Sequence, residues 1–249
     1  MSPEIISVVG ASPTPVVIVL ACLVWAGVYR ALRTLDYSAA DRTAPLALAG
    51  VFMGAWLALA IWLGSRGFFH GSPTETVPKV AFGLVVPMAI ALVILATSQR
   101  ARDIVAATPV HLLIAVQLYR VEGAIFLIMY AAGRLPGEFG LPAGWGDVMI
   151  GATAPLVAWL YRRDAIRWRG LAVLWNVLGL ADLFIAVAMG VLTAPGRLQQ
   201  FALDAPNTLI TSFPLVLVPV FLVPVSILLH GMALWHLSGS ERHRTLGSG

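Results

Sequence analysis

The chain has 249 residues, of which 59% are hydrophobic and only 11% are charged, with a formal net charge of +4. Soluble domains carry about 25% charged residues, so this composition excludes an ordinary soluble protein. The mean hydropathy is +0.87, and the apolar residues form helix-length runs, which predicts a multi-pass protein of the lipid bilayer. The basic balance does not indicate a nucleic-acid partner, because the charges lie in short segments between apolar runs.

The two ends of the chain differ from the rest in polarity. The N-terminal stretch MSPEIISVVGASPTP has no positively charged region, so we expect no cleaved signal peptide. Residues 238–249 are polar, and we expect them to form a disordered tail whose last residues resemble a tag remnant. The single cysteine, Cys22, allows no internal disulfide.

Seven membrane-spanning helices are predicted, forming a single all-α domain over residues 1–237. In chain order, their approximate ranges are 15–32, 45–63, 80–97, 109–132, 148–161, 168–192 and 208–237. The fifth span is short. The seventh is longer than a hydrocarbon core of about 30 Å requires, so we expect it to tilt, bend or begin in a loop.

Local signals predict where several spans begin. Thr108 and Pro109 are typical of an N-cap residue followed by the first helical position, and Pro45 is expected to start the second span in the same way. Asp147 is expected to cap the fifth span. The preceding segment 133–147 is rich in glycine and proline, so we interpret it as an ordered outer loop.

The basic residues predict the orientation. Those in the segments after spans 1, 3 and 5 and in the tail are Arg30, Arg33, Arg42, Arg100, Arg102, Arg162, Arg163, Arg167, Arg169, Arg242 and Arg244. Those of the opposite side are Arg66, Lys79, Arg134 and Arg197. Because cytoplasmic loops carry the excess of basic residues, we expect the N-terminus outside and the C-terminus inside a cell membrane of the bacterial inner-membrane type.

Seven helices in this orientation match two broad architectures, the rhodopsin-like bundle and the SWEET-type triple-helix repeat, as analogies of fold only. Retinal pigments need a lysine in the last helix. The one lysine of this chain, Lys79, lies near the outer end of the third span, so no covalent retinal is expected. Spans 1–3 are not repeated in spans 5–7, which argues against the SWEET-type arrangement.

Three charged residues lie at mid-membrane depth, where charge is costly and usually functional: Arg120 and Glu122 in the fourth span and Asp182 in the sixth. In an α-helix, Arg120 and Glu122 point about 200° apart, whereas Gln117 shares the face of Arg120. We therefore expect a central fourth helix in which Arg120 pairs with Asp182. Glu122 is expected to lie on the face of Leu118 and to gain or lose a proton.

This cluster predicts an integral membrane protein that binds or translocates a small, anionic or amphiphilic ligand. The candidate ligand-binding residues are Gln117, Arg120, Glu122, Asn176 and Asp182. Gln117 and Asn176 lie on the cytoplasmic side of Arg120 and would extend a polar path toward the cytoplasm. The competing interpretation is a buried ion pair that only fixes helix register.

Two other functions remain open from the sequence. One is a membrane redox protein holding haem or a metal through His111, His230 and His236, although no HxxxH, HExxH or CxxCH motif is present. The other is an accessory membrane subunit. The chain carries no GxSxG, P-loop or acidic metal motif, so an enzyme is not favoured.

The last span contains three prolines at five-residue intervals, Pro214, Pro219 and Pro224. Each interior proline removes one backbone hydrogen bond and bends the helix. We expect Pro214 to start the helix and the other two to bend it, leaving carbonyl groups without their helical partners.

Overall fold

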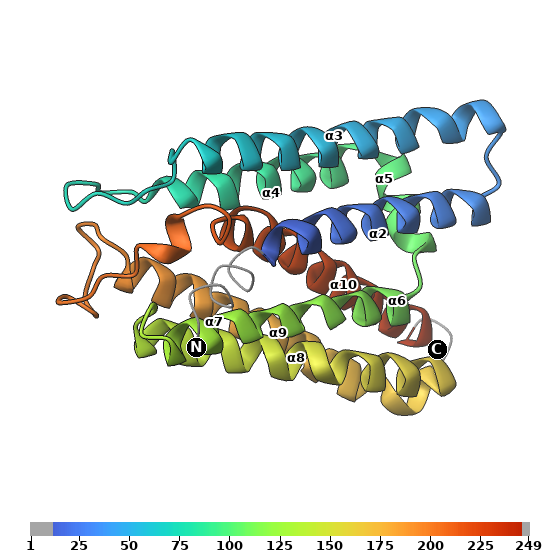
Figure 1. Ribbon diagram of the computed structural model, residues 1–249. Coiled ribbons are helices and arrows are strands. Elements are labelled where there is room, and N and C mark those ends of the chain that lie inside the picture. Colours follow the sequence, from blue (N-terminus) through green and yellow to red (C-terminus); the bar gives the residue numbers. More distant parts are fainter. Residues whose placement is uncertain (1–11, 246–249) are drawn as a thin grey trace.

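The computed structural model describes residues 12–245, and over that range the chain folds into helices without a β-strand (Figure 1). The all-α class is therefore confirmed. In chain order, the elements are α2 (Pro13–Thr34), α3 (Ala39–Ser65), α4 (Lys79–Thr97), α5 (Gln99–Ala107), α6 (Val110–Ala115), the 3-10 helix η1 (Val116–Gly123), α7 (Ala124–Ala131), α8 (Gly137–Arg163), α9 (Ala165–Thr193), the 3-10 turn η2 (Leu209–Thr211), the π-helix η3 (Val218–Leu222) and α10 (Val223–Thr245).

Six helical stretches of the described chain are long and apolar enough to cross a membrane, which makes this a multi-pass membrane protein. They are Pro13–Thr34, Asp41–Ser65, Lys79–Thr97, Val110–Ala131, Ala165–Thr193 and Val218–Gly239. Each coincides with a predicted span. The fifth predicted span lies within α8, which has 27 residues but is not one of the six.

The segment 133–147 is not the outer loop that the sequence predicted. α8 begins at Gly137, so Asp147 lies inside this helix and does not cap it. The prediction was wrong because glycine and proline were taken as loop signals. Membrane helices tolerate both residues where neighbouring helices pack closely, and α8 packs along α7, η1 and α9.

The start of α3 also differs from the prediction. The helix begins at Ala39, where the Ser38 hydroxyl accepts a hydrogen bond from the Asp41 amide at 3.2 Å, and Pro45 lies inside the helix. A side-chain cap outweighed the proline signal here. Similarly, Pro109 occupies the N-cap position of α6, one residue later than expected.

The last predicted span, 208–237, begins in irregular chain, and Pro214 lies in a turn there and does not start the helix. After η2 the chain forms a turn, then the π-helical η3, and then α10. In an α-helix the carbonyl of Val220 would accept a hydrogen bond from residue 224, but Pro224 has no N–H. The indole Nε1 of Trp56 in α3 donates to this carbonyl instead, at 3.0 Å.

The predicted disordered tail is helical in its first part, because α10 continues to Thr245. Residues 246–249, at the end of the expected tail, lie outside the described residues. So does the stretch 1–11, on which the prediction about a signal peptide depends.

The helices form two groups on either side of α10, which passes between them in Figure 1. We call α6–η1–α7, α8, α9 and α10 the charged half, because it contains Arg120, and α2, α3 and α4 the apolar half. Of the most apolar 18 residues of each spanning stretch, 61% are buried in Val218–Gly239, which contains most of α10, but none in α4. α10 is therefore the central helix, with α6–η1–α7 beside it at 44%.

At one end of the bundle, the short helix α5 is tied to the α2–α3 connection. Tyr37 donates a hydrogen bond from its hydroxyl to Asp103 at 2.7 Å. This bond holds the pKa of the Asp103 carboxyl below its usual value and raises the pKa of the Tyr37 hydroxyl. An exposed ion pair between Arg100 and Asp41, at 3.0 Å, joins α5 to α3.

Candidate functional site: a buried arginine between two carboxylates

The site is built on η1, the 3-10 segment in the middle of the fourth span. A 3-10 helix has three residues per turn, so residues three apart lie above one another on one face. Gln117, Arg120 and Gly123 follow this spacing, and they are the buried residues of η1. The local winding therefore aligns the arginine with the small residue that lets α8 approach.

The other two faces of η1 have different surroundings. Leu118 and Val121 are 47% and 40% exposed, as expected of side chains that face lipid. Tyr119 and Glu122 share the third face and line a cavity. The expectation that Glu122 lies on the face of Leu118 was wrong, because it assumed α-helical winding.

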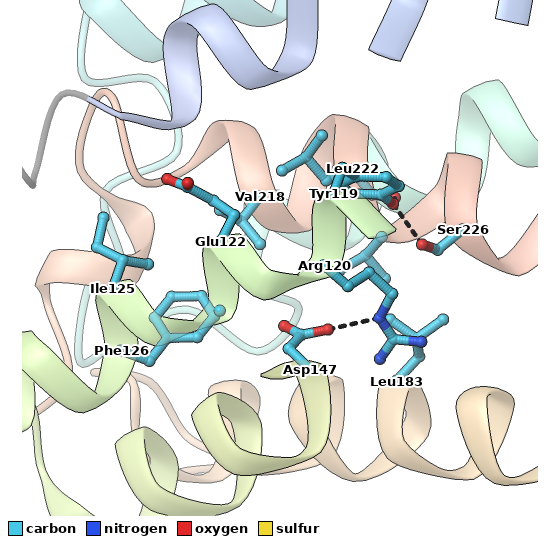
Figure 2. Close-up of a pocket in the computed structure, with 12 residues that line it drawn as sticks. Tyr119, Arg120, Glu122, Ile125, Phe126, Asp147, Leu183, Val218, Leu222 and Ser226 are labelled. Carbon is cyan, nitrogen blue, oxygen red and sulfur yellow. Dashed lines mark hydrogen bonds and ion pairs between the residues drawn. The ribbon is translucent and has the colours of Figure 1, made fainter. Parts of the chain in front are cut away.

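Arg120 lies between two acidic residues from different helices, and Figure 2 shows its contact with the first of them, Asp147. Its Nε donates to Oδ1 of Asp147 in α8 at 2.7 Å, and its Nη2 contacts Oδ2 of Asp182 in α9. Its Nη1 faces the Gly179 carbonyl at 3.3 Å and the ring of His230 at 3.2 Å. The Arg120 side chain is only 1% exposed, and all three of its nitrogens are bonded.

A directed chain of hydrogen bonds continues from Arg120. Because arginine only donates, Nε2 of His230 accepts from it, and Nδ1 of the same ring donates to Oδ1 of Asn176 at 2.8 Å. The Asn176 amide nitrogen then donates to the Ala172 carbonyl at 2.8 Å. These contacts require a neutral His230 whose two ring nitrogens are both engaged.

A second polar group joins η1 to α10. Ser226 donates from its hydroxyl to Oε1 of Gln117 at 2.9 Å, and the Gln117 amide nitrogen faces the Ser226 carbonyl at 3.4 Å. The Tyr119 hydroxyl contacts the Ser226 hydroxyl and donates to the Leu222 carbonyl at 3.1 Å. Both polar atoms of the Gln117 side chain thus have a partner on α10.

Three glycines make room for the cluster. A Cβ atom on any of them would collide with a side chain of the cluster, so the helices could not approach as closely. The pairs are Gly123 with Asp147, Gly146 with Asp182, and Gly179 with His230. The close packing of η1, α8, α9 and α10 therefore depends on these positions.

Two adjoining cavities reach the cluster. The smaller, about 320 Å³ including its mouth, is lined by residues of η1, α7, α8, α9, η3 and α10, among them Tyr119, Glu122 and Asp147 (Figure 2). The larger, about 780 Å³, lies between the beginning of α4 and the end of α9, and its lining is apolar except for Asp147 and Thr211. Both cavities are lined by Phe126, Asp147, Leu183, Val218 and Val223. Asp147 is therefore the carboxylate that lines both the smaller cavity, beside the Arg120 cluster, and the larger, apolar cavity.

Three of the five predicted site residues belong to the Arg120 network: Arg120 from η1, and Asn176 and Asp182 from α9. Gln117 lies on the same face of η1 as Arg120 but bonds to Ser226. The predicted pair of Arg120 with Asp182 is confirmed. Glu122 does not join this network. It is half-buried, and its carboxylate accepts a hydrogen bond from Ser12, just before α2.

Sequence reasoning missed Asp147, His230 and Ser226 as members of the cluster. The signal for Asp147 was its position near Gly140, Gly144 and Gly146, since small residues at such spacing are typical of close helix contacts in membranes. His230 and Ser226 are four residues apart on one face of α10. Their polarity within an apolar run was a signal of the same kind.

Two of the histidines proposed for haem or metal, His230 and His236, have separate partners within the protein. His230 is bonded to Arg120 and Asn176, and His236 contacts the Val105 carbonyl through Nε2 at 2.6 Å. No group of three or more His, Cys, Asp or Glu side chains within residues 12–245 has a metal-binding arrangement.

A family model described as a domain of unknown function, DUF8737, matches residues 77–238. This range covers more than half of the chain. The chain belongs to the DUF8737 family. The matched range runs from just before α4 into α10 and contains every member of the arginine cluster and both cavities. No curated protein and no solved structure matches the chain.

Proposed function

We propose that this DUF8737 protein binds, and carries across the membrane, a small amphiphilic ligand held in the two cavities beside Arg120. The observation that carries the proposal is the shared wall of these cavities, in which Asp147 borders both polar and apolar space. Ligand sites are mostly apolar cavities with a few converging polar groups, and the larger cavity has this composition.

The polar end of the ligand would lie in the smaller cavity and the apolar part in the larger one. The apolar lining of the larger cavity suits the apolar part, and Asp147 lines both cavities. Arg120 is an unsuitable primary contact for an anionic group, because each of its nitrogens already has a partner. Its role in the proposal is to orient Asp147 and Asp182.

The proposed membrane arrangement has seven spans, with α8 as the fifth. Figure 1 shows α8 lying alongside α9, and a helix of 27 residues is about 40 Å long, enough to cross a bilayer. Arg162 and Arg163 at the end of α8, with Arg167 and Arg169 at the start of α9, would lie in the cytoplasm. In this arrangement the N-terminus would lie outside.

A ligand-binding experiment on cavity-filling variants tests the proposal. In Ala186→Phe, the new ring would occupy the larger cavity, which Ala186 lines. Ile185→Phe is the matched control, since Ile185 is 47% exposed on the same helix and does not line either cavity. Both variants and the unaltered protein would be reconstituted in lipid nanodiscs and screened with small amphiphiles by thermal unfolding.

We expect some amphiphiles to raise the melting temperature of the unaltered protein and of Ile185→Phe, but not that of Ala186→Phe. A ligand at 100 times its Kd stabilises by about 2.7 kcal/mol, which is readily measured. The same compounds should accumulate in proteoliposomes containing the unaltered protein. If no amphiphile shifts the melting temperature, or if Ala186→Phe responds as the control does, the cavities are not the binding site.

A further inference from the structure

We infer that the ligand is a lipophilic cation, with a protonated amine or quaternary ammonium group beside Asp147 and an apolar part in the larger cavity. This inference rests on the proposed function and names the chemical class of its ligand. It depends on two observations: the charge around the cavities, and the hydrogen-bonding character of the atoms that remain unpaired.

The charges do not balance. Asp147 and Asp182 contact Arg120, and Glu122 lines the smaller cavity. Arg120 is the single basic side chain among these groups, and His230 is held neutral by its hydrogen bonds. With all three carboxylates ionised, the group has a formal charge of −2. Charges buried at this depth must be paired or neutralised, and a bound cation would pair with the carboxylates that Arg120 leaves uncompensated.

The remaining polar atoms are acceptors. Asp147 accepts from Arg120 through Oδ1, and its Oδ2 has no hydrogen bond in the described part of the chain. Asp182 similarly contacts Arg120 through Oδ2 alone. The side chains of these two residues are 14% and 13% exposed, so each is mostly buried and keeps one carboxylate oxygen available to a ligand. A ligand that supplies a donor or a positive charge would satisfy them, whereas an anion would be repelled.

The surroundings of the larger cavity match an apolar group attached to such a cation. Apart from Asp147 and Thr211, its lining is apolar, and the Thr211 hydroxyl donates to the Thr208 carbonyl at 3.0 Å. The aromatic side chains of Phe126 and Phe139 line the same cavity. Aromatic faces attract quaternary ammonium groups, which adds a second favourable interaction near the carboxylate.

A pair of isosteric probes tests the inference directly. The first is 3-phenylpropyltrimethylammonium, whose charge does not change with pH. The second has a tert-butyl group in place of the trimethylammonium group and is neutral. A carboxylate of the same length, 4-phenylbutyrate, completes the series. Binding of all three to the protein in nanodiscs would be measured by equilibrium dialysis, with empty nanodiscs subtracted.

The variants are Asp147→Asn and Glu122→Gln, with Glu138→Gln as the matched control. Glu138 lies exposed at the start of α8 and lines neither cavity. Because Glu122 is not paired with Arg120, Glu122→Gln tests the charge effect even if Asp147→Asn does not fold. Each substitution removes one negative charge while keeping the shape of the side chain.

We expect the cation to bind roughly tenfold or more tightly than its neutral isostere, and the anion to bind least. Asp147→Asn and Glu122→Gln should weaken binding of the cation and leave that of the neutral probe unchanged, while Glu138→Gln changes neither. If the neutral or anionic probe binds as well as the cation, the inferred ligand class is wrong although the binding function stands. If none of the probes binds and no other amphiphile shifts the melting temperature, the proposed function itself fails.

Discussion

In a soluble protein the most apolar segments are the most buried. In this protein the apolar half is the more exposed one, and the charged half is the more buried. α4 has the highest mean hydropathy of the six spanning stretches, 2.6, and none of its 18 most apolar consecutive residues is buried. The stretch Val110–Ala131 has the lowest mean hydropathy, 1.8, and 44% of its 18 most apolar consecutive residues are buried. The less apolar helices therefore form the interior.

The physical reason is that lipid offers apolar side chains no penalty for remaining outside. Association of helices in a bilayer depends instead on close packing of small residues and on polar contacts. The charged half has both, in the glycines around the cluster and in the ion pairs of Arg120. The apolar half instead presents side chains such as Val51, Leu59 and Val93, each more than half exposed, as a surface for lipid.

The largest effect should come from Arg120→Ala. This change leaves Asp147 and Asp182 side by side without their counter-charge, which costs about 3–5 kcal/mol where a buried pair loses one partner. The free energy of unfolding would be measured by titration with a denaturing detergent. We expect a large decrease or loss of folded protein.

The matched control for this prediction is Arg100→Ala. Arg100 pairs with Asp41 at 3.0 Å, but both side chains are about half exposed, so we expect no measurable change. Equal effects of the two substitutions would contradict the contrast between buried and exposed ion pairs. A triple variant, Arg120→Met with Asp147→Asn and Asp182→Asn, should regain part of the lost stability because no unpaired charge remains.

A smaller effect is expected when a methyl group is added at a helix contact. In Gly146→Ala, the new Cβ would collide with the Asp182 carboxylate, which forces α8 and α9 apart at a cost of about 1–3 kcal/mol. In α3, Gly54→Ala meets no atom within 4 Å. There, higher helix propensity should stabilise the protein slightly, by up to about 1 kcal/mol.

Melting temperatures of the two glycine variants would compare how closely the helices pack in the charged half and in the apolar half. We expect a lower value for Gly146→Ala and an unchanged or slightly higher one for Gly54→Ala. A decrease of the same size in both would show that the apolar half is packed as closely as the charged half.

The smallest of the three effects concerns the hydrogen bond that joins α3 of the apolar half to η3, the segment that leads into α10. In Trp56→Phe, the Val220 carbonyl loses the indole donor, and an unpaired buried carbonyl costs about 1–3 kcal/mol, here partly relieved by movement of the bent chain. Pro224→Ala supplies the missing backbone N–H. We therefore expect Trp56→Phe to be less harmful in the Pro224→Ala background.

A double-mutant cycle on unfolding free energies measures this coupling. The two substitutions should compensate each other. Strictly additive effects would mean that the indole does not replace the missing proline N–H, and that α3 is held against η3 by ring contacts such as that of Trp56 with Phe221, at 4.9 Å between centroids.

Much of the framework was readable along the chain because the bilayer imposes it locally. A run of about 20 apolar residues is a spanning helix wherever it occurs, so six predicted spans coincide with helices in the structure. The cost of burying a charge likewise singled out Arg120 and Asp182 and required that they meet, as they do. Both inferences depend on properties of single segments, their hydrophobicity and their charge, which can be read without knowing how the segments pack.

Tertiary structure decided which groups complete the site. Asp147 lies 27 residues from Arg120 and His230 lies 110 residues away, and no local period relates such positions. The 3-10 winding of η1 and the extension of α8 through a stretch rich in glycine and proline also depend on neighbouring helices. Close packing of α8 on η1 makes both of these features favourable. The sequence by itself determined that the buried charge of Arg120 must be paired, and the packing of the helices determined which residues pair with it.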